Sequence, residues 1–386
     1  MTMVALLMLF GDRLKYLGLV AGLAFATLLI TQQGSILIGM ASQTGAWIRD
    51  SGQADLWIMD EQVDFSEDAK PLPDTALYRV RGVEGVQWAV PIYKNWLKGQ
   101  LPDGRKMTVI VVGLDDATLV GAPPGMVEGK LEDLRTEKAL FIEARDADTK
   151  LRLTRGAFAA APRALRVGDR LSINDQELRV AGTMRLSRSF FWDPVIYTTY
   201  TRALSIAPPE RRLMNFVLVK VRPGIDPIRV QADIKRATGL EALTGDEFEA
   251  RTAKYILEKT GILINFGLAV GLGFVIGLLV AAQTLYAFTL DNLRHFAALK
   301  AMGAGNATLV GMMSVQVVVV ALLGLGIGLG ATALMGRLIV ATDLAFKMTW
   351  HVPVAGAAAL LVICLISGAL SMLKVLRLEP AIVFKG

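Results

Sequence analysis

The sequence has 386 residues, 53% of them hydrophobic, and a formal net charge of +6. Its mean hydropathy of +0.46 is high for a soluble protein. Four stretches contain no Asp, Glu, Lys or Arg: residues 16–48, 260–290, 301–336 and 348–373. Each exceeds the roughly 20 residues that a helix needs to cross a bilayer, where backbone groups must be satisfied internally. We therefore expect an α-helical membrane protein and exclude a wholly soluble one.

The first segment, residues 1–15, precedes the first apolar stretch and carries Arg13 and Lys15. Residues 16–48 are predicted to form transmembrane helix 1. A cleaved signal peptide is the alternative, but the apolar core of such a peptide usually has about 7–15 residues. Because this stretch is longer, we expect a retained membrane anchor.

Residues 49–259 form the large hydrophilic part of the chain and suffice for a domain with its own core. Apolar runs typical of strands alternate there with turn residues, and Asp226-Pro227 is a favoured helix opening. Hairpin turns are expected at Asp103-Gly104 and Asn174-Asp175. This pattern predicts a mixed α and β domain. Its expected strands include residues 54–60, 106–115 and 216–221.

A helical pattern over residues 247–259 ends directly at the second apolar stretch, which predicts transmembrane helix 2 at 260–290. We expect one unbroken helix across that boundary, because such a helix would carry motion between the membrane and the domain. The remaining predicted segments, in chain order, are a connection at 291–303, transmembrane helix 3 at 304–336, a loop at 337–347, transmembrane helix 4 at 348–373 and a tail at 374–386.

Positive residues set the expected orientation, because loops rich in Lys and Arg remain in the cytoplasm. With four spans, both termini and the connection 291–303 lie on the more positive side. The large domain is therefore expected outside the cytoplasm, which is the periplasm in a Gram-negative cell. The net charge then reflects topology, and no basic face for nucleic acid is indicated. The cytoplasmic positive residues would be Arg13, Lys15, Arg294, Lys300, Lys374, Arg377 and Lys385, against Arg337 and Lys347 on the other side.

No catalytic, cofactor or metal site is indicated. The sequence lacks the G-x-x-x-x-G-K-[ST] pattern of a P-loop and the H-E-x-x-H pattern of zinc proteases. Its two histidines, His295 and His351, have no ligand partners at a useful spacing, and its one cysteine, Cys364, is expected to be buried. No predicted span holds a central charge, which argues against an ion pathway. The aromatic run SFFWDP at 189–194 is interpreted as domain core, with a partner-binding loop as the alternative.

Glycine spacing indicates close helix packing in the second and third spans. Small residues four apart let two helices approach, either within one subunit or between two copies. A bend at residues 324–330 is a further alternative, and all three stay open. The glycines expected to pack are Gly267, Gly271, Gly273, Gly277, Gly324 and Gly328.

The connection between the second and third spans has a helical character of its own. Asp291 is expected to cap a short helix there, and Gly303 is expected to end it. The mixed face of this helix would suit docking into a groove on another protein. A passive loop at the lipid headgroups is the alternative that composition favours.

Residues 294–310, RHFAALKAMGAGNATLV, resemble the cytoplasmic segment of the FtsX/MacB-type permeases of ABC transporters. The family layout also fits: one N-terminal span, a MacB-like domain containing VGDRLSINDQELRVAGTM, three C-terminal spans and a final LEPAIVF at 378–384. Residues 12–33 are most similar to the DevC branch, whose ATPase is a separate polypeptide. The chain departs from many relatives at Gly305-Asn306-Ala307 and at Gln316.

The resemblance implies four transmembrane helices with a large α+β MacB-like domain inserted between helices 1 and 2. It implies a non-catalytic permease subunit that works with a second copy or a close paralogue and couples ATP hydrolysis to movement of the outer domain. ATP would be bound by the partner ATPase, with no cofactor in this chain. A periplasmic adaptor and an outer-membrane channel would be the further partners for export. The residues expected to contact the ATPase are Asp291, Arg294, His295, Leu299, Lys300, Met302 and Gly303.

Three other functions are alternatives. A permease of this kind could extract lipids or lipoproteins, which a hydrophobic cavity in the outer domain would favour. It could instead regulate a cell-wall hydrolase, as FtsX does. A sensor or membrane enzyme is the third, although the sequence shows no kinase motif and no catalytic set.

Overall fold

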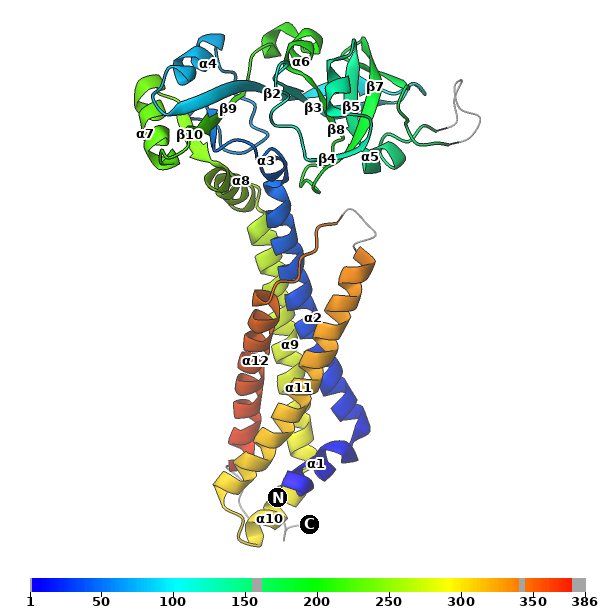
Figure 1. The fold of residues 1–386 in the computed structure, drawn as a ribbon. Helices are drawn as coiled ribbons and strands as arrows, with labels where there is room; N and C mark the ends of the chain where they lie inside the picture. Colours follow the sequence, from blue (N-terminus) through cyan, green and yellow to red (C-terminus); the bar gives the residue numbers. More distant parts are fainter. Residues whose placement is uncertain (1, 155–161, 340–343, 377–386) are drawn as a thin grey trace. The chain divides into compact units, whose positions relative to one another are not determined.

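The computed structural model describes residues 2–154, 162–339 and 344–376 (Figure 1). The chain divides into two compact units. A membrane unit comprises Met1–Met40 and Gly261–Gly386, and an outer unit comprises Ala41–Thr260. Within the described residues, four helices are long and apolar enough to cross a membrane. The predicted fold class, four such helices with a mixed α/β domain between the first two, is confirmed.

The long helices of the membrane unit run side by side in Figure 1. The four long helices contact one another, and part of this contact is polar. Thr31 of α2 and Thr332 of α11 share a buried hydrogen bond of 2.7 Å between their hydroxyl oxygens. Thr289 of α9 and Ser371 of α12 form another. The four helices are α2 (Arg13–Thr44), α9 (Ile262–Asp291), α11 (Asn306–Ile339) and α12 (His351–Leu376).

The first residues of the chain form a helix that the sequence reading did not predict, α1 (Thr2–Gly11). Ala5 and Leu9 are buried in the membrane unit. Gln316 of α11 is 2% exposed, and its side-chain nitrogen donates a 2.7 Å hydrogen bond to the backbone oxygen of Ala5. This bond gives a buried amide a partner and ties α1 to α11.

The outer unit is built on a ten-stranded sheet with the order β10-β1-β9-β2-β3-β8-β5-β7-β4, and β6 pairs with β2 and β7. Both predicted hairpins are present, β2 with β3 and β6 with β7. Gly104, Asn174 and Asp175 have the positive φ angles that tight turns need. The strands are β1 (Leu56–Met59), β2 (Val86–Gln100), β3 (Lys106–Leu114), β4 (Gly125–Glu128), β5 (Ala139–Glu143), β6 (Arg170–Ile173), β7 (Gln176–Arg185), β8 (Val195–Thr199), β9 (Phe216–Val221) and β10 (Glu241–Thr244).

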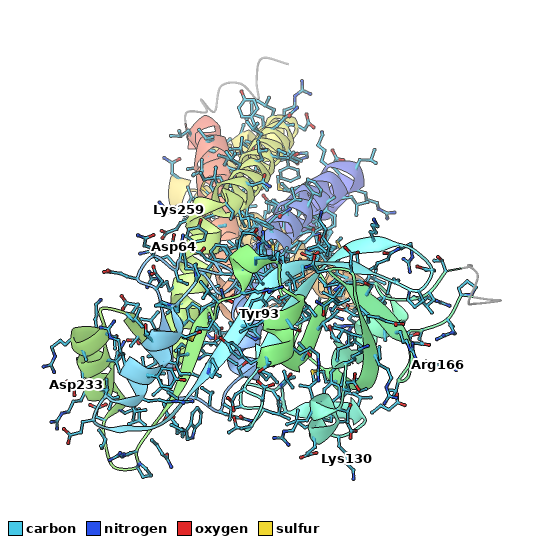
Figure 2. The ribbon with its side chains drawn as sticks, turned by 90° about the horizontal axis from the view of Figure 1, so that it is seen from above. Asp64, Tyr93, Lys130, Arg166, Asp233 and Lys259 are labelled. Carbon is cyan, nitrogen blue, oxygen red and sulfur yellow. The ribbon has the colours of Figure 1, made fainter. Side chains whose placement is uncertain are left out.

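Helices cover parts of this sheet and bury its apolar faces. Figure 2 shows Tyr93 of β2 between Asp233 at one end of the outer unit and Arg166 at the other. Asp226 caps α7 as predicted, because its carboxylate accepts a 3.0 Å hydrogen bond from the Ile228 amide. The helices are α3 (Ala46–Asp50), α4 (Asp74–Arg81), α5 (Ala144–Asp148), α6 (Tyr200–Ile206), α7 (Pro227–Thr238) and α8 (Gly245–Lys259), with 3-10 turns η1 (Leu131–Arg135) and η2 (Pro209–Arg211).

The prediction of one unbroken helix from the outer unit into the second span is wrong. Helix α8 begins with a capping box of Thr244 and Glu247 and ends at Lys259. Gly261 then has a φ of +72°, and α9 begins at Ile262. This left-handed conformation suits glycine and interrupts the helical hydrogen bonds. The joint at Gly261 separates the two helices.

Several predicted boundaries also shift. The first span was expected to reach residue 48, but α2 ends at Thr44, and Trp47 and Ile48 belong to the core of the outer unit. Helix α11 continues past Arg337, which was expected in a loop. Of the predicted loop 337–347, residues 340–343 lie outside the described residues, as do Arg377, Lys385 and the LEPAIVF motif.

Candidate functional site

The connection between the second and third long helices folds as a short helix, α10 (Leu293–Ala301). Asp291 does not cap it, contrary to the prediction, because α9 continues through Asp291 itself. The Asp291 carboxylate instead forms an ion pair with Lys15 at the start of α2. Asn292 links the helices, and its side chain donates a 2.9 Å hydrogen bond to the Phe288 oxygen of α9.

Gly303 ends α10, as the sequence reading expected. Its φ is +95°, a conformation that few residues other than glycine adopt readily. The amide of Gly303 bonds to the Lys300 oxygen at 3.1 Å, and the amide of Ala304 bonds to the Leu299 oxygen at 3.0 Å. These bonds satisfy carbonyl groups that the end of a helix otherwise leaves free.

Helix α10 has one buried face. Phe296 and Ala297 are each 1% exposed. Phe296 packs with Leu309 and Met313 of α11, and Leu299 packs against the same cluster. Sequence reasoning missed Phe296. The signal was its position three residues before Leu299, which places both on one side of a helix.

The opposite face of α10 is open. Asp291, Arg294 and His295 are exposed, and Met302 is 76% exposed. Gly303 is exposed too, whereas Leu299 and Lys300 are half-buried. The predicted contact residues therefore separate into an open group and Leu299, which belongs to the inner cluster. The arrangement is a small helix that is held by apolar packing on one face and is exposed on the other.

Four of the predicted packing glycines lie against α2. A Cβ added at Gly324 would lie 2.7 Å from the Leu23 Cβ, and one at Gly273 would lie 3.0 Å from the Leu29 Cβ. Gly328 faces Thr27 and Gly277 faces Ala26 in the same way. These close approaches seat α9 and α11 on the first helix.

The other two glycines behave differently. A Cβ at Gly267 or Gly271 would have nothing within 4 Å. Within the part of the chain that the structure describes, these two glycines therefore do not pack against another helix, and contact between two copies stays a hypothesis for them. Helix α11 runs without interruption through residues 324–330.

Helices α3 and α8, near the two chain ends of the outer unit, contact each other. Arg49 of α3 forms an ion pair with Glu249 of α8. Trp47, also on α3, packs edge-on to Trp57 of β1 with ring centroids 4.8 Å apart. The ring of Phe216 is tilted relative to that of Trp47, and the centroids of these two rings are 5.4 Å apart. Aromatic packing thus anchors α3, the short helix that directly follows α2, in the core of the outer unit.

A buried ion pair lies next to Trp47 in this core. The Lys94 Nζ atom of β2 lies 2.6 Å from the Glu67 Oε1 atom, and the two side chains are only 4% and 3% exposed. The Lys94 ammonium also lies 3.7 Å from the ring centroid of Trp47, which is a cation–π contact. Burial lowers the pKa of Lys94, and the attraction of Glu67 opposes this shift. Sequence reasoning missed this pair, although a Lys that follows the apolar run of β2 directly, as Lys94 does, is a signal.

The remaining predictions about sites concern metal ligands, Cys364 and the aromatic run at 189–194. Within residues 2–154, 162–339 and 344–376, no three His, Cys, Asp or Glu side chains are grouped to hold a metal ion. Cys364 is buried, as expected. The run at 189–194 divides between the two interpretations: Phe191 packs against the core, whereas Trp192 is 66% exposed.

The fold and this arrangement define a membrane protein whose large domain follows the first long apolar helix and whose second and third long apolar helices are joined by a short helix. Two family models match the chain. The MacB-like periplasmic core domain matches residues 17–237, and the FtsX-like permease C-terminal model matches residues 266–380. The chain belongs to the FtsX/MacB-type family of ABC transporter permeases.

Curated relatives agree with this family. An uncharacterized ABC transporter permease of Mycobacterium bovis is 25% identical over 57% of this chain and 58% of its own length. Another, of Methanocaldococcus jannaschii, is 26% identical over 48% of this chain and 47% of its own length. The chain thus matches about half the length of these relatives.

Solved structures of outer domains are also similar. The periplasmic region of MacB from Actinobacillus actinomycetemcomitans covers 53% of this chain and 94% of its own, with 14% identity and a TM-score of 0.38. The extracellular domain of YknZ, a noncanonic ABC-type transporter from Gram-positive bacteria, covers 50% of this chain and 99% of its own, with 11% identity and a TM-score of 0.34. Because these scores are low, the family assignment rests on the family models.

Proposed function

We propose that this permease couples ATP hydrolysis in a separate ATPase subunit to movement of its outer unit, with α10 as the docking helix on the cytoplasmic side. The observation that carries this proposal is the contrast between the packed face and the exposed face of α10. Its Phe296 is locked against α11, while Arg294, His295 and Met302 are open to a partner. A force applied to the open face would pass to α11 through a packed contact.

The contacts of α2 support the next step of this coupling. Gly324 and Gly328 of α11 lie against α2, and α2 is one continuous helix up to Thr44. Trp47, three residues later, is in the core of the outer unit. The joint at Gly261 makes α8 and α9 less suited to rigid transmission. We therefore assign the main path to α2.

Export through an adaptor and an outer-membrane channel, by a pair of permease copies as in the DevC branch, is the route we propose. Two hollows of the outer unit include charged side chains: one of about 540 Å³ is bordered by Asp116, Glu137 and Arg202, and one of about 680 Å³ has a mixed lining in which Arg163 and Asp169 lie beside Leu153. Such linings do not suit acyl chains, so they favour transmission over extraction of lipids by the outer unit. The size of the outer unit argues against a simple regulator of a cell-wall hydrolase.

The test uses full-length permease in nanodiscs with the ATPase encoded beside its gene. Arg294→Glu and Met302→Glu change the open face of α10, and Arg229→Glu on α7 is the control for charge reversal. We expect the two α10 variants to remain folded and to weaken ATPase binding by about tenfold, which corresponds to about 1.4 kcal/mol. Arg229→Glu should bind like the wild type. Normal binding and normal stimulation by both α10 variants would overturn the docking role.

Leu299→Asp is unsuitable for this test. Leu299 packs against the cluster of Phe296, Leu309 and Met313. A carboxylate there would disrupt the fold of α10 itself. Loss of activity in that variant would not distinguish docking from unfolding.

A further inference from the structure

The aromatic loop at residues 189–194 has one side chain that the core does not use. This loop connects β7 to β8. Trp192 is 66% exposed, although the indole ring is among the most strongly apolar groups that a protein carries. Its neighbours on both sides are held in place.

Phe191, on one side of Trp192, is part of an aromatic stack. Its ring centroid lies 6.2 Å from that of Phe65 and 6.0 Å from that of Trp96. Phe65 in turn stacks on Tyr255 of α8 at 4.9 Å. Asp193, on the other side, accepts a 3.2 Å hydrogen bond from the Trp96 indole nitrogen. The loop therefore presents Trp192 outward from a fixed backbone.

The same loop is bonded to the chain that leaves the first span. The Phe190 amide donates a 3.2 Å hydrogen bond to the Gln43 oxygen in the last turn of α2. Ser187, just before the loop, donates from its amide at 2.8 Å and from its hydroxyl at 2.6 Å to the Asp50 carboxylate on α3. The loop is thus tied to the last turn of α2 and to α3.

The length of α2 shows where that end lies. The helix has 32 residues, which at about 1.5 Å per residue is roughly 48 Å. A bilayer measures about 30 Å across its hydrocarbon and roughly 40–45 Å with its headgroup regions. With Arg13 and Lys15 in one headgroup region, Gln43 reaches the opposite one. Exposed tryptophans concentrate at this depth in membrane proteins, since the ring is apolar and its N–H is polar.

We propose that loop 189–194 is an interfacial anchor, in which Trp192 inserts into the phospholipid headgroup region of the leaflet next to the outer unit. This anchor holds the outer unit at a fixed height on the membrane. It does not depend on the coupling role of α10. A partner protein is the competing occupant, and the connection of the loop to α2 favours lipid.

The test measures the fluorescence of Trp192 in full-length permease in phosphatidylcholine nanodiscs. The signal is the difference between the wild type and Trp192→Phe, which removes the fluorophore and keeps an aromatic ring. Nitroxide lipids carry the quencher either near the headgroup or at the chain end, and acrylamide probes the water. Trp88→Phe gives the matched difference for a half-buried tryptophan of β2.

We expect the Trp192 difference signal to be quenched at least twofold more by the headgroup-level nitroxide than by the chain-end nitroxide. The Trp88 difference signal should respond to neither lipid. Quenching of Trp192 by acrylamide alone would overturn the proposal, because the ring would then lie in water. Resistance to all three quenchers would also overturn it and would indicate that protein covers the ring.

Discussion

Replacing Gly328 by Ala should destabilise the membrane unit, because the contact between α11 and α2 leaves no room for a methyl group. A Cβ at Gly328 would lie 2.5 Å from the Thr27 Cβ and 2.7 Å from the Ala24 backbone oxygen. Neither atom is the end of a flexible side chain, so α2 and α11 must move apart. Overpacking of this kind costs about 1–3 kcal/mol.

Gly330→Ala is the matched control for this change. A Cβ at Gly330, two residues further along α11, would meet nothing within 4 Å. Both substitutions share the gain of roughly 0.5–1 kcal/mol that Ala has over Gly within a helix. The two variants should therefore differ in free energy of unfolding by about 1–3 kcal/mol, the overpacking cost alone.

The assay is unfolding of the full-length protein in mixed micelles by increasing SDS fraction, followed by circular dichroism of the helices. Gly328→Ala should unfold at a lower SDS fraction than the wild type, and Gly330→Ala at an equal or higher one. Equal stability of the two variants would refute the reasoning, since α2 and α11 would then separate at no cost.

Three further predictions concern buried polar groups. Lys94→Met should destabilise the outer unit by about 3–5 kcal/mol in denaturant titrations, because it leaves the buried Glu67 carboxylate with a hydrogen bond from Ser66 but without the positive charge of Lys94. The double variant with Glu67→Leu should recover most of this loss. Gln316→Leu removes the hydrogen bond to α1 and should cost about 0.6 kcal/mol, with faster proteolysis of the N-terminus as the readout. The third concerns Asp103, where burial raises the pKa but hydrogen bonds from Thr154 and Arg105 outweigh it and lower the pKa to about 2. A lowered pKa in the folded state stabilises the protein above the ordinary value of 3.8, and this contribution disappears as the pH falls towards 2. Asp103→Asn should therefore be less stable than the wild type at pH 7, and the difference should shrink between pH 4 and pH 2.

The candidate site was partly predictable from the sequence. Gly303 ends α10 as expected, because a positive φ is a local property that glycine permits. The cap at Asp291 was wrong, because the sequence does not show where α9 stops, and α9 includes Asp291. Phe296 was missed because its role depends on packing against Leu309 and Met313, which belong to the next helix, α11.

Other parts depended on contacts between distant residues. Glycine spacing could not separate Gly324, which lies against α2, from Gly267, which faces open space. The buried pair of Lys94 and Glu67 joins a strand to a loop well before it in the chain. Such pairs become visible only when the sheet has formed.

The sequence by itself determined the membrane character of the chain, the number of long apolar helices, the hairpins of the outer unit and the family. These features follow from local properties, namely the length of apolar stretches, the pairing of turn residues with short strands, and a characteristic motif. The tertiary structure alone decided which glycines of α9 and α11 lie against α2, that Gly261 separates α8 from α9, and that Trp192 is left outside an aromatic core. Each of these depends on which surfaces meet in three dimensions, and hydrophobicity along the chain does not encode which apolar face meets which.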